Sequence, residues 1–145
     1  MPQNGINLPG IEALSKAIRS NLKVLNLNDN TLTADGGKII ADALKESQPQ
    51  LESVNFSDCL LKSEGFSHIL NAMKDTGILE NLNWFDVSGN EIGGDDVVDL
   101  ILNVFGDTTK DYSGLTLNLS SNCFGESNCS IITDDLNERL NLVLE

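Results

Sequence analysis

The chain has 145 residues, of which 40% are hydrophobic and 21% are charged, and its formal net charge at pH 7 is −13. This hydrophobic content is enough to bury a core, which excludes a chain that is disordered throughout. The negative charge disfavours nucleic acid and anionic membranes as partners and favours a basic protein. No stretch has the roughly 18 apolar residues of a membrane-spanning helix, and the N-terminus lacks the pattern of a secretory signal peptide.

An apolar pattern recurs along the chain and sets its organisation. In the segment LKVLNLNDNTL at residues 22–32, leucines occupy nearly all the apolar positions and Asn30 occupies the polar one. Alternating apolar residues of this kind indicate a short strand with one buried face. The spacing is typical of a leucine-rich repeat. It returns at residues 51–61 and 82–92 and more loosely at 114–124, and residues 1–6 match the end of a further copy.

The polar position occurs once in each copy and predicts a ladder of buried side chains. A small polar side chain at this position can satisfy backbone groups that the turn after each strand leaves unpaired. Successive positions are 26, 29, 31 and 32 residues apart, which leaves room for a full helix in each repeat. The predicted ladder residues are Asn4, Asn30, Cys59, Asn90 and Asn122.

Helices are predicted between the strands, because apolar residues recur 10 and 14 positions after each ladder residue, on one helical stripe. A glycine six positions after three of the ladder residues is expected to let the helix start lie close to its strand. The expected helices span about 8–20, 34–47, 63–75 and 94–105, and the expected strands about 24–28, 53–57, 84–88 and 115–119.

The two ends depart from the repeat. Residues 1–21 are interpreted as a truncated first repeat, 22–113 as three full repeats, and 114–145 as the last repeat with a closing helix. Thr133 to Asp135 predict the opening of that closing helix. Its expected apolar face consists of Leu136, Leu140, Val143 and Leu144.

These elements predict a single α/β domain, a leucine-rich repeat solenoid shaped like a horseshoe, with a parallel sheet on the concave side and helices on the convex side. A start inside a repeat indicates a piece of a longer array. The N-terminal edge of such a piece would be exposed and could pair with another molecule, so self-association is a further expectation.

The residues between the buried strand positions predict a partner-binding surface. They are short, rich in amides and mildly acidic, which suits hydrogen bonds and ion pairs to a protein that carries Lys and Arg. Plain solvent exposure of the strand face is the alternative interpretation. Trp84 is either an interface anchor or a cover for a neighbouring strand. The predicted partner-binding residues are Gln3, Asn26, Asn28, Asp29, Asn55, Asp58, Trp84 and Asp86.

No cofactor, metal site or catalytic group is indicated by the residue types. The three cysteines, Cys59, Cys123 and Cys129, have only His68 as a possible imidazole co-ligand, and their odd number favours a reducing compartment. No set of Ser, His and Asp or of Cys and His has support from spacing. The chain is therefore not expected to be an enzyme.

The repeat length, with a full helix in each unit, resembles the ribonuclease-inhibitor class of leucine-rich repeats. Within that class, the segments MPQNGIN, LKVLNLNDNTLT and LESVNFSDCLLKSEG resemble consecutive repeats of Ran GTPase-activating proteins. The resemblance covers about residues 1–105 and fades after Gly106. It implies a crescent that binds the small GTPase Ran, accelerates GTP hydrolysis without an arginine finger, and regulates nucleocytoplasmic transport from the cytoplasm or the nuclear envelope.

The resemblance also implies that the activating asparagine and the basic interface residues lie in early repeats, and no position of this chain matches them. The expected contribution of this chain is a scaffold with rim contacts through Asn28, Asp29 and Asp58. Two alternatives stay open: a decoy that binds a basic enzyme, as ribonuclease inhibitor does, and a scaffold of the tropomodulin kind.

Overall fold

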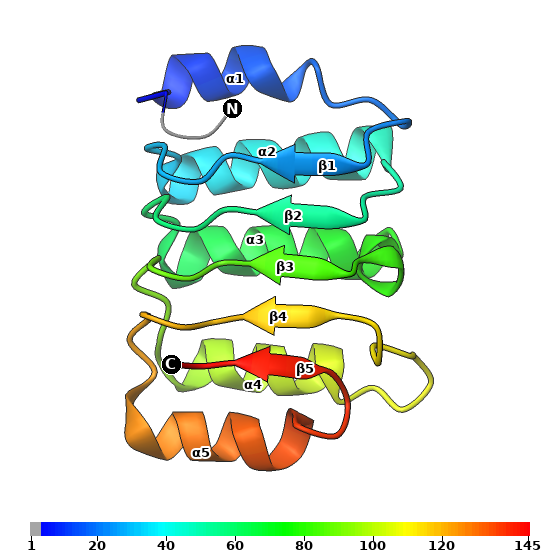
Figure 1. The fold of residues 1–145 in the computed structure, drawn as a ribbon. Coiled ribbons are helices and arrows are strands. Elements are labelled where there is room, and N and C mark those ends of the chain that lie inside the picture. Colours follow the sequence, from blue (N-terminus) through cyan, green and yellow to red (C-terminus); the bar gives the residue numbers. More distant parts are fainter. Residues whose placement is uncertain (1–3) are drawn as a thin grey trace.

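The computed structural model describes residues 4–145, which form five strands that alternate with five α-helices. The strands lie in the order β1-β2-β3-β4-β5, and each pairs in parallel with the next (Figure 1). The predicted α/β solenoid is therefore confirmed. The elements are α1 (Leu8–Ser15), β1 (Val24–Asn26), α2 (Thr33–Ser47), β2 (Ser53–Asn55), α3 (Lys62–Asp75), η1 (Ile78–Asn81), β3 (Trp84–Asp86), α4 (Asp95–Phe105), β4 (Thr116–Asn118), α5 (Gly125–Leu136) and β5 (Asn141–Val143).

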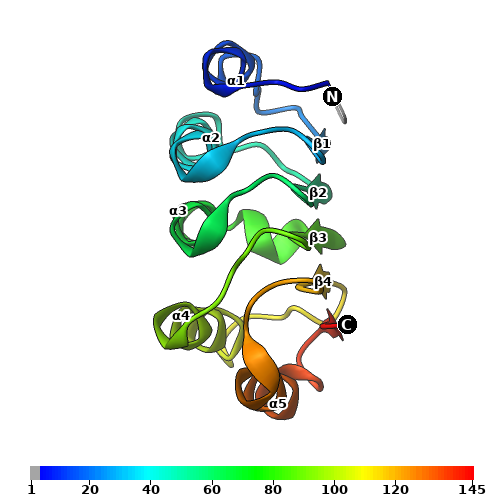
Figure 2. The same cartoon turned by 90° about the vertical axis from the view of Figure 1, so that its left-hand side faces the viewer.

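The helices cover one face of the sheet and leave the other face open (Figure 2). In this view the strands lie closer together than the helices, so the stack curves with the strands on the inner side. None of the helices in the described residues is long and apolar enough to cross a membrane.

The strands and the first helix are shorter than the sequence predicts. Each strand has three paired residues, although the pairing continues one step further, since the Leu27 N–H donates to the Asn55 carbonyl at 2.8 Å. Helix α1 ends at Ser15 rather than near residue 20, and the chain returns to the sheet through turns in which only Ile18 stays buried. The short 3-10 helix η1 was not predicted.

The predicted closing helix is wrong. Thr133 to Asp135 belong to the last turns of α5, which begins at Gly125, and the residues after it form the strand β5. The repeat frame overrides the local helix signal. Ile132 and Leu136 are fully buried, as are the equivalent pairs Ile40 and Leu44 of α2 and Ile69 and Met73 of α3. Leu142 pairs with Leu117 of β4, and Val143 points to the solvent-facing side. The period of two in Leu140, Leu142 and Leu144 is the signal that the helical interpretation missed.

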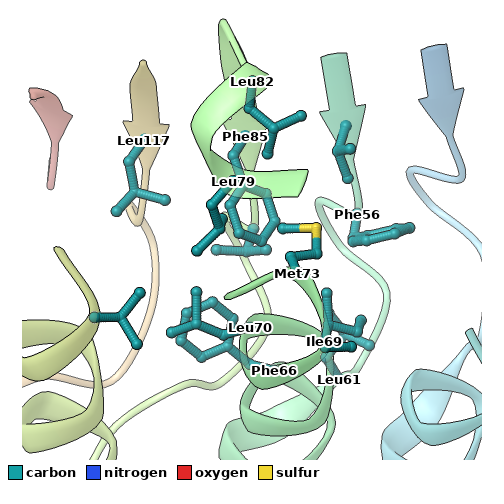
Figure 3. Packing of buried hydrophobic residues seen from close by; sticks show 14 of the residues in the cluster. Phe56, Leu61, Phe66, Ile69, Leu70, Met73, Leu79, Leu82, Phe85 and Leu117 are labelled. Carbon is teal, nitrogen blue, oxygen red and sulfur yellow. The ribbon is translucent and has the colours of Figure 1, made fainter. Parts of the chain in front are cut away.

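The core lies between the sheet and the helices and is filled by stacked aromatic and aliphatic side chains (Figure 3). Phe85 of β3 and Phe66 of α3 are fully buried, with ring centroids 6.3 Å apart. Leu79 and Leu82 close the core at the end where η1 leads into β3. The helix therefore packs on the strand that follows it in the chain.

Helices α2 and α3 approach each other at backbone distance. A Cβ at Gly37 would lie 2.9 Å from the Gly65 Cα, and a Cβ at Gly65 would lie 3.1 Å from the Ala34 Cα. The expectation that Gly65 brings its helix close to a strand is therefore wrong in its reason, because the close approach is between helices. Between α3 and α4 the spacing widens, and a hollow of about 430 Å³ opens between Ser63 and Gly94.

The ladder side chains join each repeat to the one before it. The Asn90 Nδ2 donates to the carbonyls of Phe56, Val87 and Ser88 at 2.8, 2.9 and 3.1 Å. The Asn90 Oδ1 accepts the backbone N–H groups of Cys59 and Leu61 at 3.0 and 3.1 Å. One fully buried amide thus satisfies backbone groups of two repeats at a place where water does not reach.

The same arrangement recurs at Asn30 and Asn122, whereas Asn4 is exposed. The Asn122 Oδ1 accepts the N–H groups of Asn90 and Ile92, and the Asn30 Oδ1 accepts those of Asn4 and Ile6. Asn30, Asn90 and Asn122 therefore each accept backbone N–H groups from the turn of the preceding repeat, so that their own repeats are bonded to it.

Cys59 is the chemical exception in the ladder. Its Sγ donates towards the carbonyls of Leu27 and Ser57 at 3.0 and 3.3 Å, and the Leu32 N–H is satisfied by backbone carbonyls instead of by this side chain. Burial raises the pKa of the Cys59 thiol to about 11. The thiol stays protonated at neutral pH and can act as a donor.

Replacing Asn90 with Ala should lower the free energy of unfolding by about 3 kcal/mol or more, because several buried backbone groups would lose their partners. Urea denaturation measures the change. The matched control is Asn83→Ala, at an exposed position before β3, which should change stability by less than about 0.5 kcal/mol. Equal losses in the two variants would contradict the ladder's role.

The Cys59 pKa predicts a pH dependence of stability. The folded pKa lies above the ordinary value of 9.0, so between pH 9 and about 11 the unfolded chain loses this proton first. Stability should therefore fall as the pH rises through that window, by at most roughly 3 kcal/mol in total. The measurement is the free energy of unfolding in urea of the wild type and of Cys59→Ala, at pH 8 and at pH 10.5. Lys and Tyr titrate in both proteins, so their contribution cancels in the difference between the two. A difference that does not change with pH would contradict it.

Candidate partner-binding surface

The open side of the sheet presents its side chains in parallel rows, because the strands pair in register. The first row runs across the beginnings of the strands and the second row across their ends, and together with the turns that follow they are called the strand face. The first row is Val24, Ser53, Trp84, Thr116 and Asn141, and the second row is Asn26, Asn55, Asp86, Asn118 and Val143.

The second row is bonded to the turns that follow the strands. The Asn118 Oδ1 accepts both the N–H and the hydroxyl of Ser120, at 3.0 and 2.7 Å. The Asp86 Oδ1 accepts the N–H and hydroxyl of Ser88 in the same way, at 2.9 and 2.7 Å. A side chain that bonds the backbone two residues further on closes an Asx turn. The second-row side chains thus stabilise the turns at which these strands end.

The pattern extends along the row to the first strands. The Asn55 Oδ1 accepts the N–H and hydroxyl of Ser57 at 2.9 and 2.8 Å, and the Asn26 Oδ1 accepts the Asn28 N–H at 3.1 Å. Asp86 also accepts from the Asn118 amide at 3.3 Å across the strands, and it is only 8% exposed. Predicted partner-binding residues of this row therefore have a structural task, which their sequence pattern did not reveal.

The rim beyond the turns carries the exposed acids of this surface. Asp29 and Asp58 occupy equivalent positions and both have positive φ, 56° and 53°, a conformation that Asp tolerates better than most residues. Gly89 occupies the same position in the next repeat, at φ 68°, and a Cβ there would collide with the Asp58 Oδ1. The Asp58 carboxylate therefore lies against Gly89 and fills the space that this glycine leaves.

Trp84 lies in the first row, on the solvent-facing side of β3, and 37% of it is exposed. Val24 lies in the same row two strands away and is 59% exposed. Sequence reasoning missed Val24, although it precedes the buried Leu25 and so must point away from the core. The strand face thus has an apolar margin at one end of the strands and an acidic margin at the other.

Of the remaining predicted residues, Gln3 lies outside the described residues. Asn28 is half-buried in the turn after β1. His68 lies on α3 and is partly exposed, with its Nε2 3.9 Å from the Glu64 carboxylate. Within residues 4–145, no group of three or more His, Cys, Asp or Glu side chains is arranged to hold a metal ion.

Arg139 is held in place by the end of α4 and the loop that follows it. Its Nε donates to the Phe105 carbonyl at 3.2 Å, and its Nη2 donates to the carbonyls of Asp107 and Lys110. These bonds connect the turn after α5 to residues 105–110, and Lys110 pairs with Glu80 of η1 at 2.6 Å. The guanidinium therefore has a structural role in joining these two segments.

A family model described as a leucine-rich repeat matches residues 20–41, which include β1, the ladder residue Asn30 and the start of α2. The chain is built of leucine-rich repeats. As a stack of such repeats with an open strand face, it is a protein–protein interaction module.

Curated relatives share part of the chain. Ran GTPase-activating protein 1 of Saccharomyces cerevisiae is 34% identical over 76 residues, which are 50% of this chain and 19% of that protein. NACHT, LRR and PYD domains-containing protein 13 of Homo sapiens is 32% identical over 91 residues, 61% of this chain and 8% of that protein. FERM domain-containing protein C of Dictyostelium discoideum is 31% identical over 74 residues, 50% of this chain and 5% of that protein. The chain thus spans less than a fifth of the length of each of these three relatives.

Replacing Asn118 with Ala should lower the free energy of unfolding by about 1–2 kcal/mol, because the Ser120 N–H and hydroxyl would lose their acceptor. The matched control is Asn141→Ala, exposed on the neighbouring strand β5, which should be nearly neutral. Thermal or urea unfolding compares the two. A neutral Asn118→Ala would show that the second row is not needed to end the strands.

Proposed function

We propose that this chain belongs to a protein that activates GTP hydrolysis by the small GTPase Ran, and that its own share of that task is to bind the GTPase by the strand face. A basic surface on the partner would complement the net charge of −13. Under this proposal the protein acts in the cytoplasm or at the nuclear envelope.

The observation that carries the proposal is the make-up of the strand face. Its rows and turns consist mostly of Asn, Asp and Ser, with the exposed apolar side chains of Val24, Trp84 and Val143 among them. No Lys or Arg occurs at residues 24–29, 53–58, 84–89, 116–121 or 141–143. A continuous surface of this kind is suited to hydrogen bonding and to ion pairs with basic side chains. The yeast Ran GTPase-activating protein among the relatives supports Ran as the partner.

We further propose that the chain supplies no catalytic group. An arginine finger must reach the transferring phosphoryl group from a flexible or exposed position. Arg139 is bonded to three backbone carbonyls, and Arg19 is exposed between α1 and β1, away from the strand face. Under this proposal, any activation of Ran depends on residues outside this chain, because no position of this chain matches the activating asparagine that the resemblance implies.

The test is a binding and hydrolysis assay with purified Ran. The chain should bind Ran that carries a non-hydrolysable GTP analogue at least tenfold more tightly than Ran that carries GDP. It should raise the rate of GTP hydrolysis by less than about twofold, because the barrier is lowered only by groups that contact the transition state.

Other outcomes separate the alternatives. Strong stimulation of hydrolysis by this chain alone would overturn the proposal that it supplies no catalytic group. Binding of a basic protein regardless of nucleotide, with an affinity that falls steeply with salt, would indicate a decoy. Absence of binding to either form of Ran would leave the general interaction role and remove Ran as the partner.

A further inference from the structure

We infer that partner binding is divided between the two margins of the strand face, with Trp84 and Val24 as apolar anchors at one margin and the carboxylates of Asp29 and Asp58 at the other. The partner is a protein surface that presents an apolar side chain and a pair of Lys or Arg side chains. This inference rests on the proposed function in taking the strand face as the binding surface, but it does not require that the partner be Ran.

The side-chain Oδ1 atoms in the middle of the strand face are already occupied as acceptors. Asn55, Asp86 and Asn118 each accept two bonds from the serine two residues further on. Asp86 and Asn118 also bond each other, and Asp86 is nearly buried. A partner that approached the middle would have to compete with bonds that end the strands. Recognition therefore falls to the margins.

The apolar margin presents large apolar side chains to solvent instead of packing them in the core. Val24 and Trp84 point away from the core, are 59% and 37% exposed, and are separated by the small Ser53. Adjacent strands are about 4.8 Å apart, so the two side chains stand about 10 Å apart on either side of Ser53. An apolar side chain of a partner can pack over Ser53 against both of them and desolvate the indole, and buried Trp is among the residues that contribute most to binding.

The acidic margin carries charge that no ion pair within residues 4–145 neutralises. Neither Asp29 nor Asp58 appears in an ion pair of the described residues, and Lys62 at the start of α3 pairs with Glu91 at 3.5 Å. Both acids are exposed on adjacent repeats, where like charges repel each other. Basic side chains from a partner would relieve that repulsion, which is the charge complementarity that fixes the partner's orientation.

The two margins are five residues apart in the sequence, and only the first three residues of each repeat's segment are strand. At about 3.3 Å per extended residue, and with a turn included, the span from the apolar anchors to the acids is at most about 16 Å. A partner must therefore place its apolar side chain and its basic pair within this separation. The requirement distinguishes a specific partner from a polycation, which would satisfy the acids alone.

The experiment selects peptides of twelve residues from a displayed library against the intact chain, and measures the affinity of each selected peptide by interferometry. Selected peptides should combine Lys or Arg with at least one aliphatic or aromatic residue. Trp84→Ala and the pair Asp29→Asn, Asp58→Asn should each weaken binding at least tenfold. Since Trp84 is the only tryptophan, its emission should shift to the blue on binding.

The control removes two acids from the helices, Glu46→Gln with Asp135→Asn, which changes the net charge by the same amount and should alter affinity less than twofold. Val24→Ser, at the more exposed anchor, tests the apolar margin without risk to the core and should weaken binding about threefold. The inference is overturned if the substitutions at one margin leave the affinity of the peptides unchanged. It is also overturned if the helix control lowers the affinity as much as the margin variants do.

The same variants measured against Ran with bound GTP analogue separate the two proposals. If selected peptides need both margins but Ran does not bind, the inference stands and the proposed function falls. If Ran binds the wild type and all variants equally, the proposed function stands and the inference falls.

Discussion

Every level of this structure depends on the hydrogen bonds that one buried amide makes to the backbone of the preceding repeat. A chain that turns sharply after a three-residue strand leaves N–H and C=O groups inside the protein that strand pairing does not reach. Asn90 satisfies them with both ends of its amide, towards its own turn and towards Cys59 and Leu61. Because each rung completes the one before it, the repeats stack in parallel and in register, and the strand face becomes a set of straight rows.

The polar residues of the strand face follow from the same need. The ladder side chains bond the turn after each strand on its core side. The second-row side chains bond the same turn on the open side of the sheet, as the Ser120 N–H does to Asn118. Polarity on an open sheet is therefore partly structural. What distinguishes this surface is the unevenness of its margins, with Trp84 exposed at one and Asp58 at the other.

The repeat frame made the fold predictable from the sequence. The pattern that Leu25, Leu27 and Asn30 represent recurs in each repeat. Its spacing alone predicts where the strand, the turn and the helix lie, with no knowledge of tertiary contacts. The last unit was mispredicted because Thr133 to Asp135 form a good local helix start, whereas the tertiary frame had already placed a helix there from Gly125. Which polar side chains of the strand face bond to their own turn was not predictable, since all of them are short polar residues next to buried positions in the sequence. Only the structure shows that Asn55 accepts bonds from Ser57, whereas Asp29 lies in the turn with positive φ.

The close approach of α2 and α3 at Gly37 and Gly65 has a mechanical consequence. Their seam coincides with the rung at which Cys59 replaces asparagine, whereas the wider seam between α3 and α4 coincides with the fully bonded Asn90. The main helix contacts in the described chain are between neighbours, so a stretching force along the solenoid passes through each seam in turn. Strand pairing joins the sheet at both seams, and close helix packing adds to it at the first, whereas the second depends on the strands and on the bonds of Asn90. Under such a force α3 and α4 should separate before α2 and α3 do.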